Sequence, residues 1–163
     1  MSRTPAIPFD DLTIRKWPDD CLVVVSPEIE IGMDLAPLAE ALFKHMDYPK
    51  GVGLSAPQLG IHTRAIAVNY KGEAFFIANP QIIKESTQMT RAREGCLSFP
   101  DKLADVKRHK RVTVTGFDEN WKPIRRKASG WMARILQHEI DHLDGITMMD
   151  RAGLWKRTPN LAS

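Results

Sequence analysis

The clearest hydrophobic pattern in the first third of the chain has the spacing of a helix. Apolar residues recur three or four positions apart, at Leu35, Leu38, Leu42, Phe43 and Met46. Asp34 precedes them and can accept hydrogen bonds from the first free N–H groups, as helix N-caps do. The spacing predicts a helix from Asp34 or Leu35 to Met46, with its apolar stripe in the core.

The middle of the chain has the pattern of a β-protein. Short runs rich in β-branched and aromatic residues alternate with turn signals such as Lys71-Gly72 and Asp118-Glu119-Asn120. They predict strands at Arg64–Tyr70, Ala74–Ala78, Gln88–Arg93, Arg111–Phe117 and Pro123–Ala128, after a first short strand at Leu22–Val25. The short separations favour antiparallel pairing.

A second helical pattern follows the last of these strands. Ser129 is an acceptable N-cap, the apolar residues behind it have helical spacing, and Gly145 ends the pattern. The elements together predict an α+β fold, in which mainly antiparallel β-sheets pack around this central helix and one further helix lies nearer the N-terminus.

Length and composition indicate one globular unit. The chain has 163 residues, close to the prior of roughly 150 residues per domain. We expect a single catalytic domain over residues 1–163, with an extended arm at 1–20 and a short C-terminal tail at 146–163. Because no apolar run reaches the length of a membrane span and the N-terminus lacks a signal-peptide pattern, we expect a cytoplasmic protein without membrane contact.

Charge is unevenly distributed along the chain. Residues 102–127 hold nine Lys or Arg and three acidic residues, although the net charge is only +3. Such a stretch could contact an anionic partner such as RNA, but it carries no nucleic-acid motif. We interpret it as the solvated face of a strand pair, and we expect no specific DNA binding.

The second helix carries residues that point to chemistry. His138-Glu139-Ile140-Asp141-His142 is an H-E-x-x-H pattern. A separation of four residues places both imidazoles on one helix face about one turn apart, where both can bind one metal ion. Glu139 could then act on a bound water as general base and later as proton donor. The alternative is a helix surface with two ordinary histidines and solvated acids.

A catalytic metal needs a third protein ligand. The pattern H-E-x-x-H-x-x-G-x-x-H is disfavoured because Met148 stands where its third histidine would be, and no glutamate follows Glu139. The other candidates are carboxylates and the side chains of Cys21, His45, His62, Cys96 and His109. Cys96 has the strongest surroundings, since it follows a strand-like run and Gly95, which allows close backbone approach. A buried structural cysteine is the alternative there.

A glycine-rich segment runs from Gly51 to Gly60. Two glycines in three residues, followed by Pro57 and Gln58, indicate backbone held close to another group with a side-chain amide nearby. The segment lacks the lysine and glycine spacing of a phosphate-binding loop. On its own it is equally typical of an ordinary turn.

Taken together, three segments resemble the signature motifs of the peptide deformylase family. They are Gly51-Val52-Gly53-Leu54-Ser55-Ala56-Pro57-Gln58, Glu94-Gly95-Cys96-Leu97-Ser98 and Gln137-His138-Glu139-Ile140-Asp141-His142-Leu143. All three occur in the family's order and with similar separations.

The resemblance implies a metal-dependent hydrolase that removes the formyl group from the N-terminal formylmethionine of nascent polypeptides and releases formate. It implies that Cys96, His138 and His142 bind one divalent metal ion, in this family commonly Fe²⁺, with Zn²⁺, Ni²⁺ or Co²⁺ as substitutes. Glu139 would supply the general base and acid. The Gln58 side-chain amide and the backbone N–H of Leu97 would stabilise the negative charge that grows on the carbonyl oxygen.

The resemblance also implies how the substrate lies. The methionine side chain would occupy an apolar pocket that uses Val52, Ile135 and the flank of His138. The peptide backbone would pair beside Val52, Gly53 and Gly95. A cramped site would admit a formyl group and exclude larger acyl groups.

The sequence departs from the family pattern after the motifs. An arginine that often follows the cysteine motif is replaced in the Asp101-Lys102-Leu103 region. The long C-terminal helix that helps many bacterial members dock at the ribosome is expected to be absent or reduced. A transient ribosome contact would then depend on little more than Lys156 and Arg157, for which a frayed polar tail is the alternative.

Two other functions compete with deformylation. One is a metallopeptidase or amidohydrolase with another acyl substrate. The other is a non-catalytic relative at the ribosome with a structural metal. Gln58, Cys96 and Glu139 argue against the second, because a structural site needs neither the amide donor nor the base.

Overall fold

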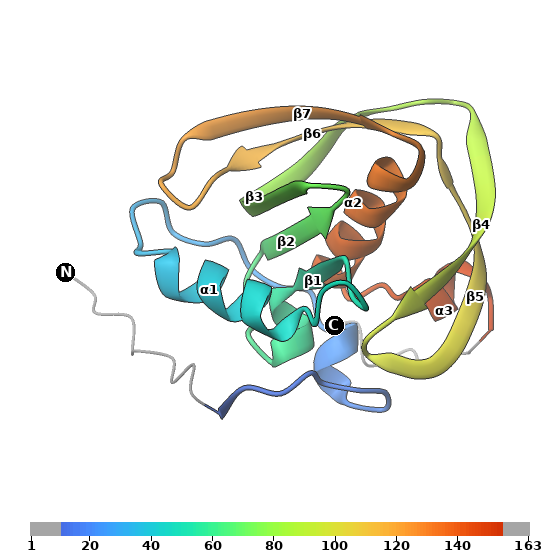
Figure 1. The fold of residues 1–163 in the computed structure, drawn as a ribbon, viewed down its shortest axis with the longest axis horizontal. Helices are drawn as coiled ribbons and strands as arrows, with labels where there is room; N and C mark the ends of the chain where they lie inside the picture. The colour runs from blue at the N-terminus through green and yellow to red at the C-terminus, as the bar shows by residue number, and fades with distance from the viewer. Residues whose placement is uncertain (1–10, 155–163) are drawn as a thin grey trace.

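A long helix lies between two antiparallel β-sheets in the computed structural model, which describes residues 11–154 (Figure 1). The helix is α2 (Gly130–Leu143). The larger sheet has the strand order β1 (Gly53–Ser55), β2 (Ala65–Tyr70), β3 (Glu73–Glu85), β6 (Arg111–Phe117) and β7 (Pro123–Ser129). The smaller sheet pairs β4 (Met89–Cys96) with β5 (Phe99–His109). The predicted α+β fold with antiparallel sheets around a central helix is confirmed.

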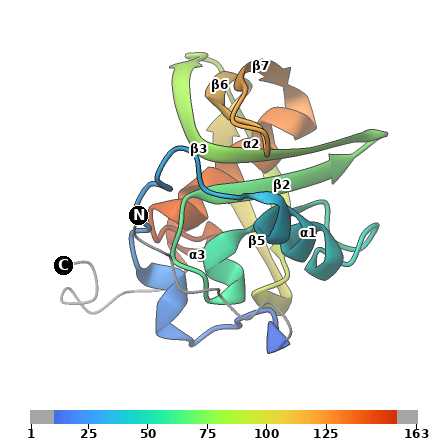
Figure 2. The same ribbon diagram turned by 90° about the vertical axis from the view of Figure 1, so that its left-hand side faces the viewer.

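β2 is buried on both faces, between α2 and the N-terminal helix α1 (Ala36–His45) (Figure 2). Ala65 and Ala67 pack in the cluster that contains the apolar stripe of α1, whereas Ile66 and Val68 pack with α2. Successive strand side chains point to opposite faces, so burial on both sides requires an unbroken apolar run. The predicted helix before it is also confirmed, and Oδ1 of Asp34 accepts a hydrogen bond from the Ala36 N–H at 3.1 Å.

The strand predicted at Leu22–Val25 is wrong. A 3-10 turn, η2 (Asp20–Val23), begins there because the Asp19 side chain accepts a hydrogen bond from the Cys21 N–H at 3.0 Å. Leu22 and Val23 are buried in this turn. The apolar run therefore fills the core through a capped turn, not through sheet pairing.

The sheets differ from the prediction at three further places, the first of which is β1, because no strand was predicted in the glycine-rich segment. β3 continues to Glu85, past Asn79 and Pro80, through a register shift that lets proline sit within a strand. β5 was not predicted at all, because its inward-facing positions are Ala104, Val106 and Arg108, and a charged residue at a buried position breaks the expected alternation.

The segment predicted as a C-terminal tail, residues 146–163, contains a short helix near its start. α3 (Met148–Arg151) is a short helix in which Thr147 and Asp150 form a reciprocal capping box, and Met148 is buried against Leu22 and Val106. The proposed tail residues Lys156 and Arg157, and the first half of the predicted arm, lie outside the described residues. Among the helices within 11–154, none is long and apolar enough to cross a membrane.

Candidate metal centre and substrate groove

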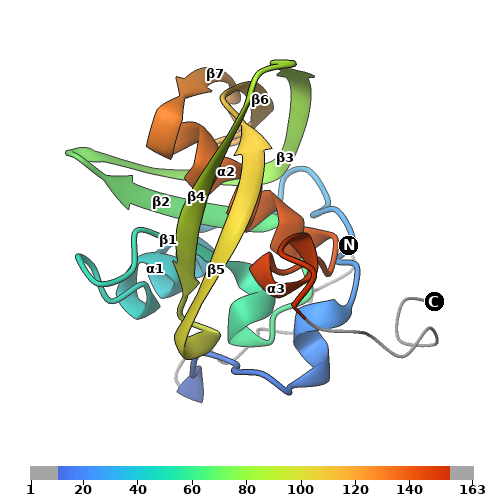
Figure 3. The ribbon, with the colours of Figure 1, turned by 90° about the vertical axis from the view of Figure 1, so that its right-hand side faces the viewer.

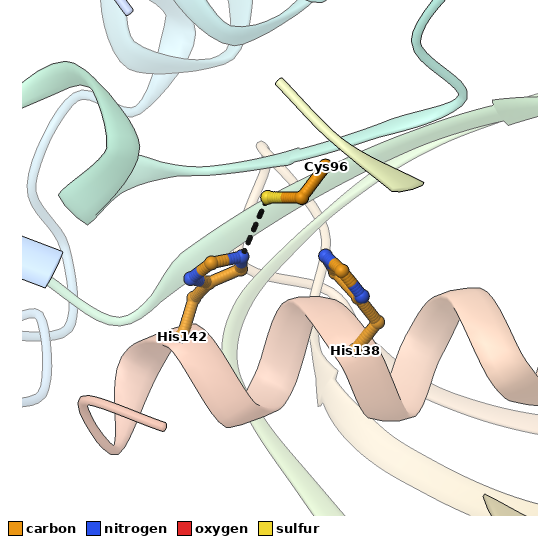
Figure 4. A group of neighbouring side chains, drawn as sticks. All are labelled: Cys96, His138 and His142. Atoms are coloured by element: carbon orange, nitrogen blue, oxygen red, sulfur yellow. Dashed lines mark hydrogen bonds between the residues drawn. The ribbon is translucent and has the colours of Figure 1, made fainter. Parts of the chain in front are cut away.

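The fold brings one cysteine and two histidines together beside the C-terminal half of α2 (Figure 4). His138 and His142 lie on one face of the helix, and Cys96 reaches them from the end of β4. The three potential ligand atoms lie within 4.8 Å of one another, and Sγ of Cys96 is 3.4 Å from Nε2 of His142. The remaining cysteine and histidine candidates are not part of this group; His45 and His109, for example, contact backbone carbonyl groups of Ala41 and Ser86.

This donor set suits a divalent metal ion. One sulfur and two imidazole nitrogens match the ligands of catalytic metal sites that keep a fourth position open. Nδ1 of His138 lies 2.8 Å from the Glu94 carboxylate, which leaves Nε2 for a metal. Burial by itself lowers the pKa of His138, but its hydrogen bonds to Cys96 and Glu94 outweigh burial and raise the pKa well above the ordinary value. The surroundings of this ring therefore favour a cation beside it, which can be a metal ion at Nε2 in place of a proton.

His142 is held differently. The side chain is 1% exposed, and Nδ1 has no hydrogen-bond partner among residues 11–154. Burial and the neighbouring charge of His138 lower the pKa of His142 well below its ordinary value. The ring is therefore neutral at physiological pH, the state in which an imidazole can bind a metal.

Glu94 is the centre of a buried ion cluster beside the ligands. Arg108 donates to both of its carboxylate oxygens at 2.8 and 2.9 Å, and Arg134 donates to one of them at 2.6 Å. Burial alone would raise the pKa of Glu94, but the hydrogen bonds from Arg108 and His138 hold it well below the ordinary value. Glu94 therefore stays ionised and can orient the His138 ring as an outer partner of the metal site.

The carboxylate of Glu139 lies in the groove that passes the candidate ligands. It is buried, and its Oε1 atom has no hydrogen-bond partner among the described residues. Burial raises the pKa of Glu139 to about 7. A carboxylate with that pKa can both accept and release a proton near neutral pH. Backbone approach at Gly53 makes this position possible, since a Cβ there would lie 2.6 Å from Oε2 of Glu139.

Gln58 is fixed with its amide nitrogen towards the site. It lies in the 3-10 turn η3 (Ala56–Leu59), where its Oε1 accepts hydrogen bonds from the N–H and the hydroxyl of Ser55 at 3.0 and 2.9 Å. Nε2 donates to Oγ of Ser98 at 3.1 Å and to Sγ of Cys96 at 3.4 Å. Because both ends of the amide are engaged, the donor already points at the candidate ligands before any substrate binds.

A groove of about 1040 Å³ runs past these side chains. Except for His142, the residues implicated by the sequence line it, namely Val52, Gly53, Gln58, Gly95, Cys96, Leu97, Ile135, His138 and Glu139. β1 borders one side of it, and the end of β4 borders the other. Such an arrangement fits an extended peptide between two strand edges.

Comparison of the sequence with known proteins identifies the family of this chain. The sequence pattern of the family described as polypeptide deformylase matches residues 11–158. The chain belongs to this family. It is accordingly an enzyme that removes the formyl group from the N-terminal formylmethionine of nascent polypeptides, and it uses a single metal ion.

Individual relatives agree with this assignment. The chain is 40% identical over 152 residues to the peptide deformylase of Thermodesulfovibrio yellowstonii, and the match covers 90% of this chain and 92% of the relative. The crystal structure of peptide deformylase from Thermotoga maritima has a TM-score of 0.81 at 32% identity and covers 86% of this chain and 96% of the other. The enzyme from the Vibrio parahaemolyticus bacteriophage VP16T, solved in complex with actinonin, has a TM-score of 0.81 at 34% identity, with 83% and 99% covered.

Several polar residues at the site were missed by the sequence reasoning. Glu94 and Asp141 lie inside the three motifs but were given no role, Arg108 was counted only as one of the basic residues of 102–127, and Arg134 was not considered. For the two of these charged residues that lie on α2, the sequence pattern gave an indication of their role. Arg134 and Asp141 lie in a helix that is buried along most of its length, and a buried charge needs a partner. The partner's identity could not be read, because Arg108 comes from a strand that was not predicted.

Proposed function

We propose that deformylation in this chain depends on Glu139 as general base and acid, with Cys96, His138 and His142 as the metal ligands. The observation that carries the proposal is the buried Glu139 carboxylate, one oxygen of which has no partner within residues 11–154, in the groove that Cys96 and His138 line. His142 lies in one group with these two ligands. A structural metal site would gain nothing from such a group, since burying it without a partner costs free energy.

The metal and Glu139 divide the chemistry. A bound divalent cation would lower the pKa of a coordinated water and polarise the formyl oxygen. Glu139 would accept a proton from the attacking water molecule as the water oxygen adds to the formyl carbon. The same proton then passes to the departing amine nitrogen as the carbon–nitrogen bond breaks, so that formate and a free N-terminus are released. The raised pKa of Glu139, about 7, suits both transfers at neutral pH.

Gln58 and Leu97 would stabilise the transition state. Negative charge grows on the formyl oxygen during attack, and donors that are already in place stabilise it most effectively. We assign this role to Nε2 of Gln58 and to the backbone N–H of Leu97. The fixed Gln58 amide supports the assignment, because its contacts with Ser55 and Ser98 remove the need for reorganisation.

Substrate recognition is proposed to use the walls of the same groove. Val52 and Ile135, with the flank of His138, would contact the methionine side chain, and the backbone at Val52, Gly53 and Gly95 would pair with the peptide. All of these residues line the groove. The narrow space around Gly53 and Glu139 favours formyl over larger acyl groups.

Fe²⁺ is the proposed native metal, with Zn²⁺, Ni²⁺ or Co²⁺ as substitutes. A cysteine sulfur and ferrous iron can both be oxidised. We therefore expect the activity of the iron form to fall during aerobic handling, while the zinc form keeps its activity. Unchanged iron content and activity after prolonged exposure to air would contradict iron as the native ion.

The cellular setting is proposed from the same activity. The chain would work as one catalytic domain in the cytoplasm, where nascent polypeptides are made. A transient ribosome contact through residues after α3 would bring it to its substrate. Co-sedimentation with ribosomes at low and high salt tests this contact, and no salt-sensitive binding would contradict it.

Formate release from formyl-Met-Ala tests the proposed roles. Metal-loaded protein should release formate from this peptide but not acetate from acetyl-Met-Ala. Glu139→Gln should bind metal normally and lose about 10² to 10⁴ in kcat. No formate from the unmutated, metal-loaded protein would overturn the assignment, and equal cleavage of the acetyl peptide would overturn formyl selectivity.

A further inference from the structure

A chain of alternating charges connects the protein surface to the metal centre. Arg151 of α3 donates from Nε and Nη2 to the two carboxylate oxygens of Asp141, at 2.9 and 2.8 Å. Oδ2 of Asp141 also accepts a hydrogen bond from Arg108 at 2.6 Å. Arg108 in turn holds both oxygens of Glu94, and Glu94 contacts Nδ1 of His138. The chain therefore ends on a candidate metal ligand.

The members of this chain differ sharply in exposure. The side chains of Glu94 and Arg108 are 3% exposed and that of Asp141 is 10% exposed, whereas Arg151 is 47% exposed. Water cannot readily replace a partner at Glu94 or Arg108, because so little of these two side chains is exposed. Arg151 is the point at which a change at the surface can be transmitted inward.

α3 holds Arg151 in place by contacts that do not involve its guanidinium. Met148 is 1% exposed in a core cluster with Leu22 and Val106, and the capping box of Thr147 and Asp150 closes the start of the helix. Figure 3 shows α3 packed beside β5, next to the end of α2. Removing the Arg151 charge should therefore leave the backbone of α3 where it is.

We propose that Arg151 is a positioning residue for the metal centre, acting through Asp141, Arg108 and Glu94. Two parallel charged hydrogen bonds fix the orientation of the Asp141 carboxylate. The Asp141 carboxylate forms an ion pair with Arg108, and Glu94 forms a second ion pair with the same guanidinium. Together with Arg134, which also donates to Glu94, the position of Arg108 determines where Glu94 meets His138.

Loss of the Arg151 guanidinium would unbalance this arrangement. Oδ1 of Asp141 would turn to water, and the uncompensated negative charge would draw Arg108 away from Glu94. Hydrogen bonds in such a network act cooperatively, so the contact between Glu94 and His138 would loosen. The His138 ring would lose part of its fixed orientation, although no ligand had been changed. This inference rests on the proposed metal site.

The test compares two arginines that both contact the α2 region. Arg151→Gln removes the outer end of the charge chain, and Arg151→Lys keeps a charge but not the paired donors. Arg64→Gln is the matched control. The Arg64 guanidinium donates to the Leu143 carbonyl and to the Asp144 carboxylate at the C-terminal end of α2, and it also contacts the Ser26 carbonyl. Each protein is loaded with Co²⁺, and its visible absorption spectrum, rate of metal loss to a chelator and thermal midpoint are measured.

Arg151→Gln should change the Co²⁺ spectrum and lose metal about 10-fold faster, the lower end of the effect of outer partners on metal affinity. Arg151→Lys should lie between this variant and the unmutated protein. Arg64→Gln should lower the thermal midpoint but keep the spectrum and the rate of metal loss. An unchanged spectrum and rate in Arg151→Gln, or the same change in Arg64→Gln, would overturn the proposal. Because these measurements need no substrate, absence of formate release would count against the proposed function alone.

Discussion

The two strand segments that border the groove act on α2 by different means. On the β4 side the contact is made by charge, since Glu94 engages His138, Arg108 and Arg134. On the β1 side it is made by the absence of a side chain, since Gly53 lets the Glu139 carboxylate lie where a Cβ would be. One border therefore depends on which side chain is present, and the other depends on having none. Substitutions on each side should consequently fail in different ways.

The largest expected effect is on stability, from the β4 side. Glu94→Gln keeps the shape of the side chain but leaves Arg134 and Arg108 short of negative charge in a buried place. Breaking a buried ion pair typically costs at least about 3 kcal/mol. We expect a loss of this size in the free energy of unfolding, measured by urea denaturation of the metal-free protein.

The control for this prediction is an exposed ion pair. Glu73 contacts Arg126 at 2.6 Å, but its side chain is 58% exposed. Glu73→Gln should cost less than about 1 kcal/mol, because solvent already screens this pair. Equal losses in the two variants would contradict the claim that burial makes Glu94 special.

The second prediction concerns the pH dependence of the same variant. Folding holds the pKa of Glu94 below its ordinary value of 4.5, so the unfolded chain binds a proton at this site before the folded protein does. The contribution of the carboxylate is therefore complete above about pH 4.5 and is lost as the pH falls. In metal-free protein, the stability difference between the unmutated chain and Glu94→Gln should narrow between about pH 5 and 3. A difference that stays constant over this range would refute the explanation.

The third prediction addresses the β1 side. In Gly53→Ala the new methyl group would lie 2.6 Å from Oε2 and 3.0 Å from Cγ of Glu139, so the carboxylate must move. We expect kcat for formyl-Met-Ala to fall by about 10²-fold, the lower end for loss of a general base. Metal content should stay normal, because the ligands are not touched. Metal loss together with activity would show that the substitution damages the whole centre.

The same contrast explains how much the sequence could predict. The two histidines, His138 and His142, were predictable because helical spacing is a property of a short segment, whereas Cys96 was assigned partly through the resemblance to the family's motif. The charges that orient them were not, because Glu94, Arg108 and Asp141 come from two strands and a helix that meet only in the folded chain. β5 escaped prediction for the same reason, since Arg108 occupies a buried position and is acceptable there only with its distant partners.

β-Propensity gives a wrong prediction near the N-terminus. Leu22 and the valines after it have high β-propensity, yet Asp19 caps a 3-10 turn at that point. The run belongs to neither sheet, and Val24 and Val25 are 38% and 60% exposed. A single capping side chain was therefore enough to override a pattern of four apolar residues.

The smallest effect is expected at the other glycine of the groove. A Cβ at Gly95 would meet only Cδ2 of Leu103, at 3.6 Å, which is ordinary van der Waals contact. On the β4 side the neighbouring Glu94 carries the contact with α2, so added bulk at Gly95 should leave kcat within about 2-fold. A moderate rise in KM is expected if the peptide pairs beside this residue, since the methyl group would stand at the substrate's edge of the groove. Steady-state kinetics of Gly95→Ala beside Gly53→Ala measures the contrast directly. If Gly95→Ala lost as much kcat as Gly53→Ala, both strands would approach α2 by close packing. The contrast between contact by charge on the β4 side and contact without a side chain on the β1 side would then be wrong.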